Sequence, residues 1–197
     1  TQWSYDKVVI PKALNSISSL FAHYSLHDES HSNTIINNIV RLFGIDSISK
    51  LSSIDLWLIL ESSYYHDIGM VFSGEEFANT IKSDDFFYFF QEIYDNKDHK
   101  LNEFAILFNI ESKQIKFKNE NVSNLYFDAI KFILAEFIRY KHSDRSEDLI
   151  VEPNIGLTLI SPRNTIPIRI FKVLGKICSS HTKNFNEIIL IFFQKLS

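Results

Sequence analysis

Apolar residues recur every three or four positions along much of the chain, which is the spacing of one face of an α-helix. The clearest case is the segment 123–142, in which polar residues fill the positions between the apolar ones. Its apolar face consists of Leu125, Tyr126, Ala129, Ile130, Ile133, Leu134, Phe137 and Ile138. The segment 54–66 repeats with the same period. We therefore predict that both segments are amphipathic helices.

Residues that favour helix ends mark the limits of further helices. Gly44 follows a periodic apolar segment, and glycine commonly terminates a helix. Ser73 and Glu76 have the spacing of a capping box, which predicts a helix start. Pro167 suits the first turn of a helix. Together these signals predict helices over 31–43, after Ser73, over 168–180 and over 184–196.

Three segments lack the helical period, namely 1–9, 110–122 and 148–166. Within them, polar and apolar residues alternate over 113–118, and 155–160 is a short apolar run, so either could form a small strand or hairpin. Only 5 glycines and 4 prolines are present, too few to punctuate a turn-rich β fold. We predict one all-α domain, a helical bundle with minor irregular or short β inserts.

Length, charge and cysteine content restrict the classes of protein. The 197 residues suit a single domain at roughly 100–200 residues per domain. The lone Cys178 excludes a disulfide framework and a cysteine-based zinc cluster. The net charge of −4 argues against a nucleic-acid partner. With no apolar run of roughly 18 residues and no signal peptide, we expect a cytoplasmic protein without a membrane partner.

Several of the 7 histidines lie where predicted helices begin or end. His31 begins one helix, and His66, His142 and His181 each end one, with Asp67 directly after His66. Helix ends from distant parts of a chain can converge on one pocket, and imidazole and carboxylate are ligands of zinc, manganese and iron. A single histidine at a helix C-terminus is ordinarily a capping or dipole-stabilising residue, so the order and spacing of the whole set carry the information.

That ordered set resembles the HD superfamily of metal-dependent phosphohydrolases, in which a His is followed by a His-Asp pair and, in many members, by two further His. The word Tyr65-His66-Asp67-Ile68-Gly69 resembles the central motif of the superfamily. The words over 26–32 and 142–146 are similar to a subgroup from bacterial conflict systems, whose HD domain often precedes an Hsp90-like ATPase. The resemblance spans residues 23–181.

The resemblance implies a metal centre and its ligands. A divalent cation (Mn, Fe, Zn, Mg or Ni), as one ion or two, would be bound by His31, His66, Asp67, His142 and His181. Asp67 would bridge the ions of a two-metal site, and Asp67 and His142 would take part in catalysis. His142 and His181 would bind the second ion or contact the substrate phosphate. Water activated by the metal would attack the phosphoester.

Two further residues are candidates for substrate binding. Arg145 could bind a phosphate through two hydrogen bonds, or it could form a surface ion pair with Glu147 or Asp148. His27 lies four positions before His31 and would line the pocket if both are helical. If 27–30 is a loop, His27 would be a more remote or surface residue.

One departure from the superfamily pattern concerns its last ligand, an Asp on a later helix. No Asp follows His181, and the acid after it is Glu187. We expect that the single domain 1–197 is cut before the last metal-ligand helix, although Glu187 could substitute or the site could be degenerate. The activity of this piece would then be in doubt even if the full protein is an enzyme.

The sequence therefore predicts a metal-dependent phosphohydrolase acting on a nucleotide or related phosphoester, in bacterial anti-phage defence. Expected partners are a phosphorylated small molecule or nucleotide, a C-terminal Hsp90-like or other effector domain, and a second copy of the chain. One alternative is a catalytically degenerate nucleotide-sensing or interaction module that regulates an attached domain. Another is a structural interaction domain with incidental histidines, suggested by the aromatic run 86–90.

Overall fold

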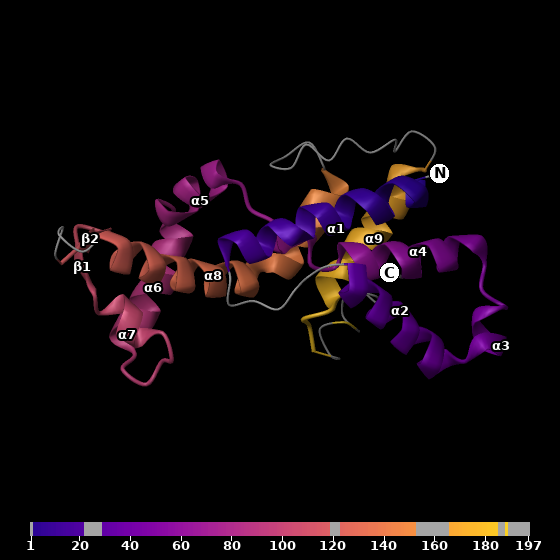
Figure 1. Cartoon of the computed structure of the whole chain (residues 1–197), viewed down its shortest axis with the longest axis horizontal. Coiled ribbons are helices and arrows are strands. Elements are labelled where there is room, and N and C mark those ends of the chain that lie inside the picture. The colour runs from indigo at the N-terminus through magenta and orange to yellow at the C-terminus, as the bar shows by residue number, and fades with distance from the viewer. Residues whose placement is uncertain (1, 22–28, 119–122, 153–165, 185–187, 189–197) are drawn as a thin grey trace, which may run out of the picture.

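The computed structural model describes residues 2–21, 29–118, 123–152, 166–184 and 188. These residues form an all-α fold with one small hairpin, as predicted (Figure 1). The elements are α1 (Gln2–Leu20), α2 (Glu29–Phe43), α3 (Ile45–Ile48), α4 (Ser53–Tyr65), the 3-10 helix η1 (Ile68–Met70), α5 (Gly74–Ile81), α6 (Asp84–Asp95), α7 (Asn102–Ala105), β1 (Phe108–Glu111), β2 (Gln114–Phe117), α8 (Ser123–Val151) and α9 (Ile168–Ser180).

Helix α8 runs along the long axis of the molecule and connects its two ends (Figure 1). At one end it is flanked by α5, α6, α7 and the hairpin, and at the other by α4 and α9, with α2 and α3 beyond them. Its most extensive packing is against α9 and η1. The predicted site residues belong to the second end, because η1 follows the His-Asp pair and α9 precedes His181.

The apolar face predicted for 123–142 forms the core of the fold. Tyr126, Ala129, Ile130, Ile133, Leu134, Phe137 and Ile138 are buried, whereas Leu125 is half exposed. The aromatic run on α6 joins this core, with the rings of Phe86 and Phe137 in an edge-to-face contact at 5.4 Å between centroids. Phe86 and Phe90 are fully buried, so this run is largely core.

Two helix predictions were wrong. Residues 1–9 were predicted to be non-helical, yet α1 starts at Gln2 and continues through Pro11. Its β-branched residues and proline are weak local signals for a helix, but Ile10 and Leu14 are buried and α1 packs against α4. Burial of an amphipathic face outweighs local propensity here.

The second wrong prediction was the end of the helix at His142. Helix α8 continues to Val151, so His142 lies in its interior. In the turn after His142, the buried positions are held by two polar residues, Ser143 and Ser146. Leu149 and Ile150 then extend the buried face. Because serine is a weak helix former that favours caps and turns, the local pattern did not indicate that the helix continues past His142.

Of the alternatives left open for 113–118, a small strand or a hairpin, the structure shows a hairpin over 108–117, in which β1 and β2 pair antiparallel with Phe108 opposite Phe117. Ser112 and Lys113 at the turn both have positive φ, of 50° and 59°. This matches the two-residue turns that suit the twist of a hairpin. The other candidate strand, 155–160, and nearly all of the predicted helix 184–196 lie outside the described residues.

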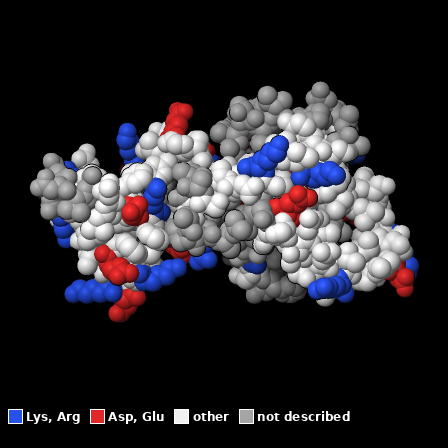
Figure 2. Space-filling view, in the orientation of Figure 1, with Lys and Arg blue, Asp and Glu red and all other residues white. Residues whose placement is uncertain are grey.

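Charged side chains are mixed on the surface. On the face shown in Figure 2, Lys and Arg lie among Asp and Glu without gathering into a basic patch of the kind that binds nucleic acid. Within the described part of the chain, no helix is both long and apolar enough to span a bilayer.

Candidate metal centre

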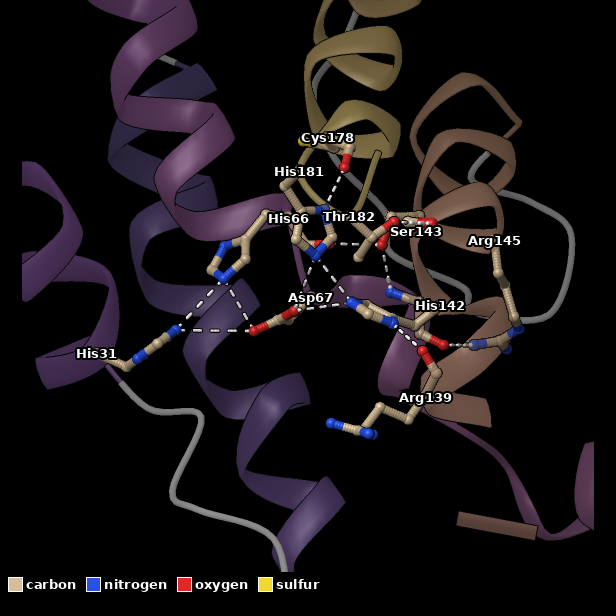
Figure 3. Close-up of polar contacts among 12 residues, drawn as sticks. His31, His66, Asp67, Arg139, His142, Ser143, Arg145, Cys178, His181 and Thr182 are labelled. Atoms are coloured by element: carbon tan, nitrogen blue, oxygen red, sulfur yellow. Dashed lines mark hydrogen bonds and ion pairs between the residues drawn. The ribbon is translucent and has the colours of Figure 1, made fainter. Parts of the chain in front are cut away.

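Five side chains from four regions of the chain meet at the predicted site (Figure 3). His31 lies in the first turn of α2, His66 caps the C-terminus of α4, and Asp67 follows it at the start of η1. His142 reaches in from the interior of α8, and His181 caps the C-terminus of α9. The five predicted ligands thus converge, although positions 31 and 181 are 150 residues apart.

The carboxylate of Asp67 divides the histidines into two pairs. Its Oδ2 lies 2.9 Å from His66 Nε2 and 3.7 Å from His31 Nε2. Its Oδ1 lies 3.3 Å from His142 Nε2 and 3.7 Å from His181 Nε2. Each pair with Asp67 forms a group of ligand atoms that lie within 4.8 Å of one another, close enough to hold a metal ion.

The rings of His142 and His181 each make a backbone hydrogen bond through Nδ1, which leaves Nε2 as the nitrogen that faces Asp67. His142 Nδ1 lies 2.5 Å from the carbonyl of Arg139, and His181 Nδ1 lies 2.5 Å from the carbonyl of Cys178. A carbonyl only accepts, so each Nδ1 donates and each Nε2 of a neutral ring is an acceptor. The Nδ1 atom of His66 is buried and has no hydrogen-bond partner among the described residues.

When both rings are neutral, the His142–His181 pair brings two acceptors together, because their Nε2 atoms are only 2.8 Å apart. The Nε2 atoms of His31 and His66 are also close to each other, at 3.3 Å. Facing lone pairs beside a carboxylate repel one another unless a proton or a metal ion lies among them. The donor set of imidazoles and one carboxylate therefore fits a divalent transition metal.

The pKa values of one pair move in opposite directions. Burial alone would lower the pKa of His142, but its hydrogen bonds to Asp67 and to the Arg139 carbonyl outweigh that effect and raise it. Burial lowers the pKa of His181 despite its bond to the Cys178 carbonyl, and the nearby His142 lowers it further. Without a metal, the pair therefore carries a single proton more readily than two.

Comparison with known families identifies the domain. The sequence model of a family described as HD-CE matches residues 21–196, nearly the whole chain. The chain belongs to the HD-CE family. The match includes all five converging residues and confirms the HD-type domain expected from the sequence. No curated protein and no solved structure matches the chain.

In this HD-CE domain, the turn after Asp67 is clamped to α8. Ser146 is fully buried, and its Oγ donates to the carbonyl of His66 at 2.8 Å and accepts from the amide of Gly69 at 2.9 Å. A Cβ at position 69 would lie 2.0 Å from the carbonyl oxygen of His142. Only glycine allows this approach, which brings Asp67 beside His142.

Arg145 adds further hydrogen bonds between α8 and the turn after Asp67 in the HD-CE domain. Its Nη1 donates to the carbonyls of Gly69 and Val71, each at 2.6 Å, and its Nη2 donates to Glu76. Burial lowers the pKa of Arg145, although Glu76 opposes that effect. Its ion-pair partner is thus on α5, in place of the Glu147 or Asp148 considered from the sequence. The predicted phosphate contact of Arg145 stays a prediction.

Sequence reasoning did not predict the roles of two residues that hold the turn after Asp67 and Arg145 in the HD-CE domain, namely Ser146 and Glu76. Ser146 was noted only as the last residue of the word 142–146, with no role of its own, and Glu76 was assigned only to a capping box. That capping box exists, with the Ser73 amide donating to Glu76 at 2.8 Å. The other predicted substrate-binding residue, His27, and the candidate ligand Glu187 lie outside the described residues.

Proposed function

We propose that this HD-CE domain is a metal-dependent phosphohydrolase that acts on a nucleotide or a related phosphoester. The observation that carries the proposal is the position of Asp67, whose two oxygens each face a pair of histidine Nε2 atoms at 2.9–3.7 Å. That symmetry suits two cations sharing one carboxylate, an arrangement that recurs in enzymes that cleave phosphoesters.

The ligand roles follow from this geometry. His31, His66 and Asp67 would hold one ion, and Asp67, His142 and His181 a second. A divalent cation bound there supplies Lewis acidity toward a phosphoryl oxygen and lowers the pKa of water at neutral pH.

The chain itself orients and shields these groups. The carbonyls of Arg139 and Cys178 hold the rings of His142 and His181 with Nε2 toward Asp67. The side chain of Asp67 is only 10% exposed, whereas that of His31 is 41% exposed. A phosphoester would therefore approach from the open side at His31, while the negative charge of Asp67 lies in the more enclosed part of the site.

The direct test measures metal content and phosphate release. Protein purified without chelator should contain a transition metal by mass spectrometry and should release phosphate from members of a nucleotide panel with Mn²⁺. Asp67→Asn should lose the metal and at least about 100-fold in rate, because it weakens both groups of ligands. The control Asp128→Asn changes an exposed carboxylate on α8 and should have no effect. A metal-free wild type, or undiminished turnover by Asp67→Asn, would refute the proposal.

A second candidate is a sensing or interaction module that regulates an attached domain. Around the junctions of α2, α3 and α4, large apolar side chains are strongly exposed, with Leu42 at 81%, Ile45 at 74% and Ile54 at 54%. Exposed apolar groups of this kind are common at interaction surfaces. Nucleotide-dependent thermal stabilisation without any hydrolysis would favour this function over the first.

The biological setting is proposed from the sequence resemblance. We place the domain in the bacterial cytoplasm, in anti-phage defence, before an Hsp90-like or other effector domain. The support is the resemblance of 26–32 and 142–146 to the conflict-system subgroup. Phage plaque counts on cells that carry the full-length protein or its Asp67→Asn variant would test this role, because the variant should lose protection.

A further inference from the structure

A pocket of about 220 Å³ lies between α2, α4 and α9, directly beside the candidate metal centre. The rings of His66 and His181 form one wall, and Asp67 does not line the pocket. The remaining wall is made mainly by Ile35 and Ile39 of α2 and Ile177 of α9. The pocket therefore adjoins the candidate centre through the rings of His66 and His181.

Helical spacing explains why the pocket and the metal centre adjoin. On α2, Ile35 lies four residues after His31, and on α4, Ser62 lies four residues before His66. On α9, Ile177 lies four residues before His181. Residues four apart share a helix face, so each of these helices presents a predicted ligand and, one turn away, a residue of the pocket wall. A molecule bound by its phosphate at the metal centre would have its remainder next to this pocket.

Among the described residues, those that line the pocket include no Asp, Glu, Lys or Arg. The hydroxyls of Ser62 and Ser63 both donate to the carbonyl of Ile59, at 3.1 and 2.7 Å, and so present lone pairs without charge. An uncharged lining strongly disfavours a second phosphate or another ion and favours an apolar group.

The volume of the pocket limits the size of the group that it can bind. Pockets for whole small-molecule ligands usually measure about 300–1,000 Å³, so a volume of about 220 Å³ suits one part of a ligand. The rings of His66 and His181 meet edge to face with 5.4 Å between centroids, and such edges and faces also pack well against an aromatic ring.

We infer that this pocket, here called the α2–α4–α9 pocket, binds the uncharged, single-ring organic group of a phosphoester whose phosphate lies at the metal centre. The inference rests on the proposed function, and it adds the substrate class. Phosphoesters of neutral ring-sized groups are preferred over polyphosphates and over esters that carry a charge next to the scissile bond.

The test compares two non-hydrolysable probes that differ only in the ring. Calorimetry with Mn²⁺-loaded protein should show benzylphosphonate binding at least about tenfold more tightly than methylphosphonate, because only the former buries a ring. Ile39→Trp, which fills the pocket, should abolish this preference and leave methylphosphonate affinity and metal content unchanged. Asn38→Trp adds the same side chain at an exposed neighbouring position of α2 and should keep the preference.

Two further measurements distinguish a failure of the pocket assignment from a failure of the proposed phosphohydrolase function. If Ile39→Trp fails to fold, Ile39→Ala should still reduce the preference several-fold. NMR with benzyl alcohol, a neutral probe that needs no metal, should shift the methyl signals of Ile35 and Ile177. Equal affinity for the two phosphonates and no such shifts would overturn the pocket assignment. Shifts with benzyl alcohol in a protein that binds no Mn²⁺ would instead refute the phosphohydrolase while leaving the ring-binding pocket.

Discussion

At the scale of single residues, the candidate site depends on small side chains as much as on its histidines. Gly69 allows the backbone after Asp67 to touch α8, and Ser146 satisfies the buried polar groups of that turn. Buried donors and acceptors without partners cost roughly 1–3 kcal/mol each. The orientation of Asp67 is therefore set by neighbours that would never bind a metal themselves.

A pair of glycine substitutions tests this dependence. Gly69→Ala should lower the free energy of unfolding by about 3 kcal/mol or more and weaken Mn²⁺ binding, because the new Cβ would lie 2.0 Å from the carbonyl oxygen of His142. Gly74→Ala is the matched control, since its Cβ meets nothing within 4 Å at the start of α5. It should leave stability unchanged or raise it by up to about 1 kcal/mol. Chemical denaturation and metal titration measure both, and equal effects would contradict the argument.

At the scale of elements, α8 is the part that organises the site. It supplies His142 to the candidate centre, and its next turn carries Arg145 and Ser146 to the backbone after His66. Arg145 also joins α8 to α5 through Glu76, with its guanidinium 4.2 Å from the centre of the Phe72 ring. One turn of α8 thus serves both the predicted ligand set and the loop that positions the rest of it.

Removing this guanidinium should be costly. Arg145→Met should lower the free energy of unfolding by about 2–4 kcal/mol, since two carbonyls lose their donor and Glu76 loses its partner. The double variant Arg145→Met/Glu76→Gln should cost less than the sum of the single changes. Arg139→Met, on an exposed ion pair with Glu136, should cost under about 1 kcal/mol. Denaturant titration measures all four, and strict additivity would show that Arg145 and Glu76 act independently.

At the scale of the whole molecule, the five converging residues connect α2, α4, α8 and α9. A metal bound there would link helices that are distant in sequence and would bind the folded chain in preference to the unfolded one. Ligand binding of this kind stabilises the fold by mass action. The candidate centre is therefore expected to contribute to stability as well as to chemistry.

Metal addition and removal test this link. Free Mn²⁺ at 100 times its dissociation constant should stabilise the fold by about 2.7 kcal/mol, which corresponds to a rise in Tm of about 5–10 °C for a chain of this size. EDTA should reverse the rise, as followed by circular dichroism. Asp67→Asn should show no Mn²⁺-dependent shift, whereas Asp128→Asn should behave like the wild type. A shift that survives Asp67→Asn would place the metal elsewhere.

The sequence by itself determined the all-α class, the capping box at Ser73 and Glu76, a short β element near 113–118 and the order of the histidines. These features depend on periodicity and on contacts between residues a few positions apart, so they can be read locally. The sequence also determined membership of an HD-type family, because the order of its motifs is itself a linear property.

Only the tertiary structure decided the features that depend on packing between distant segments. It showed α1 as a helix and α8 as one helix through His142, since buried contacts outweighed weak local propensities. It also gave Arg145 its partners on the loop and α5, and it set one histidine pair at each oxygen of Asp67. Those partners lie tens of residues apart, and no local pattern encodes which side chains meet when helices pack.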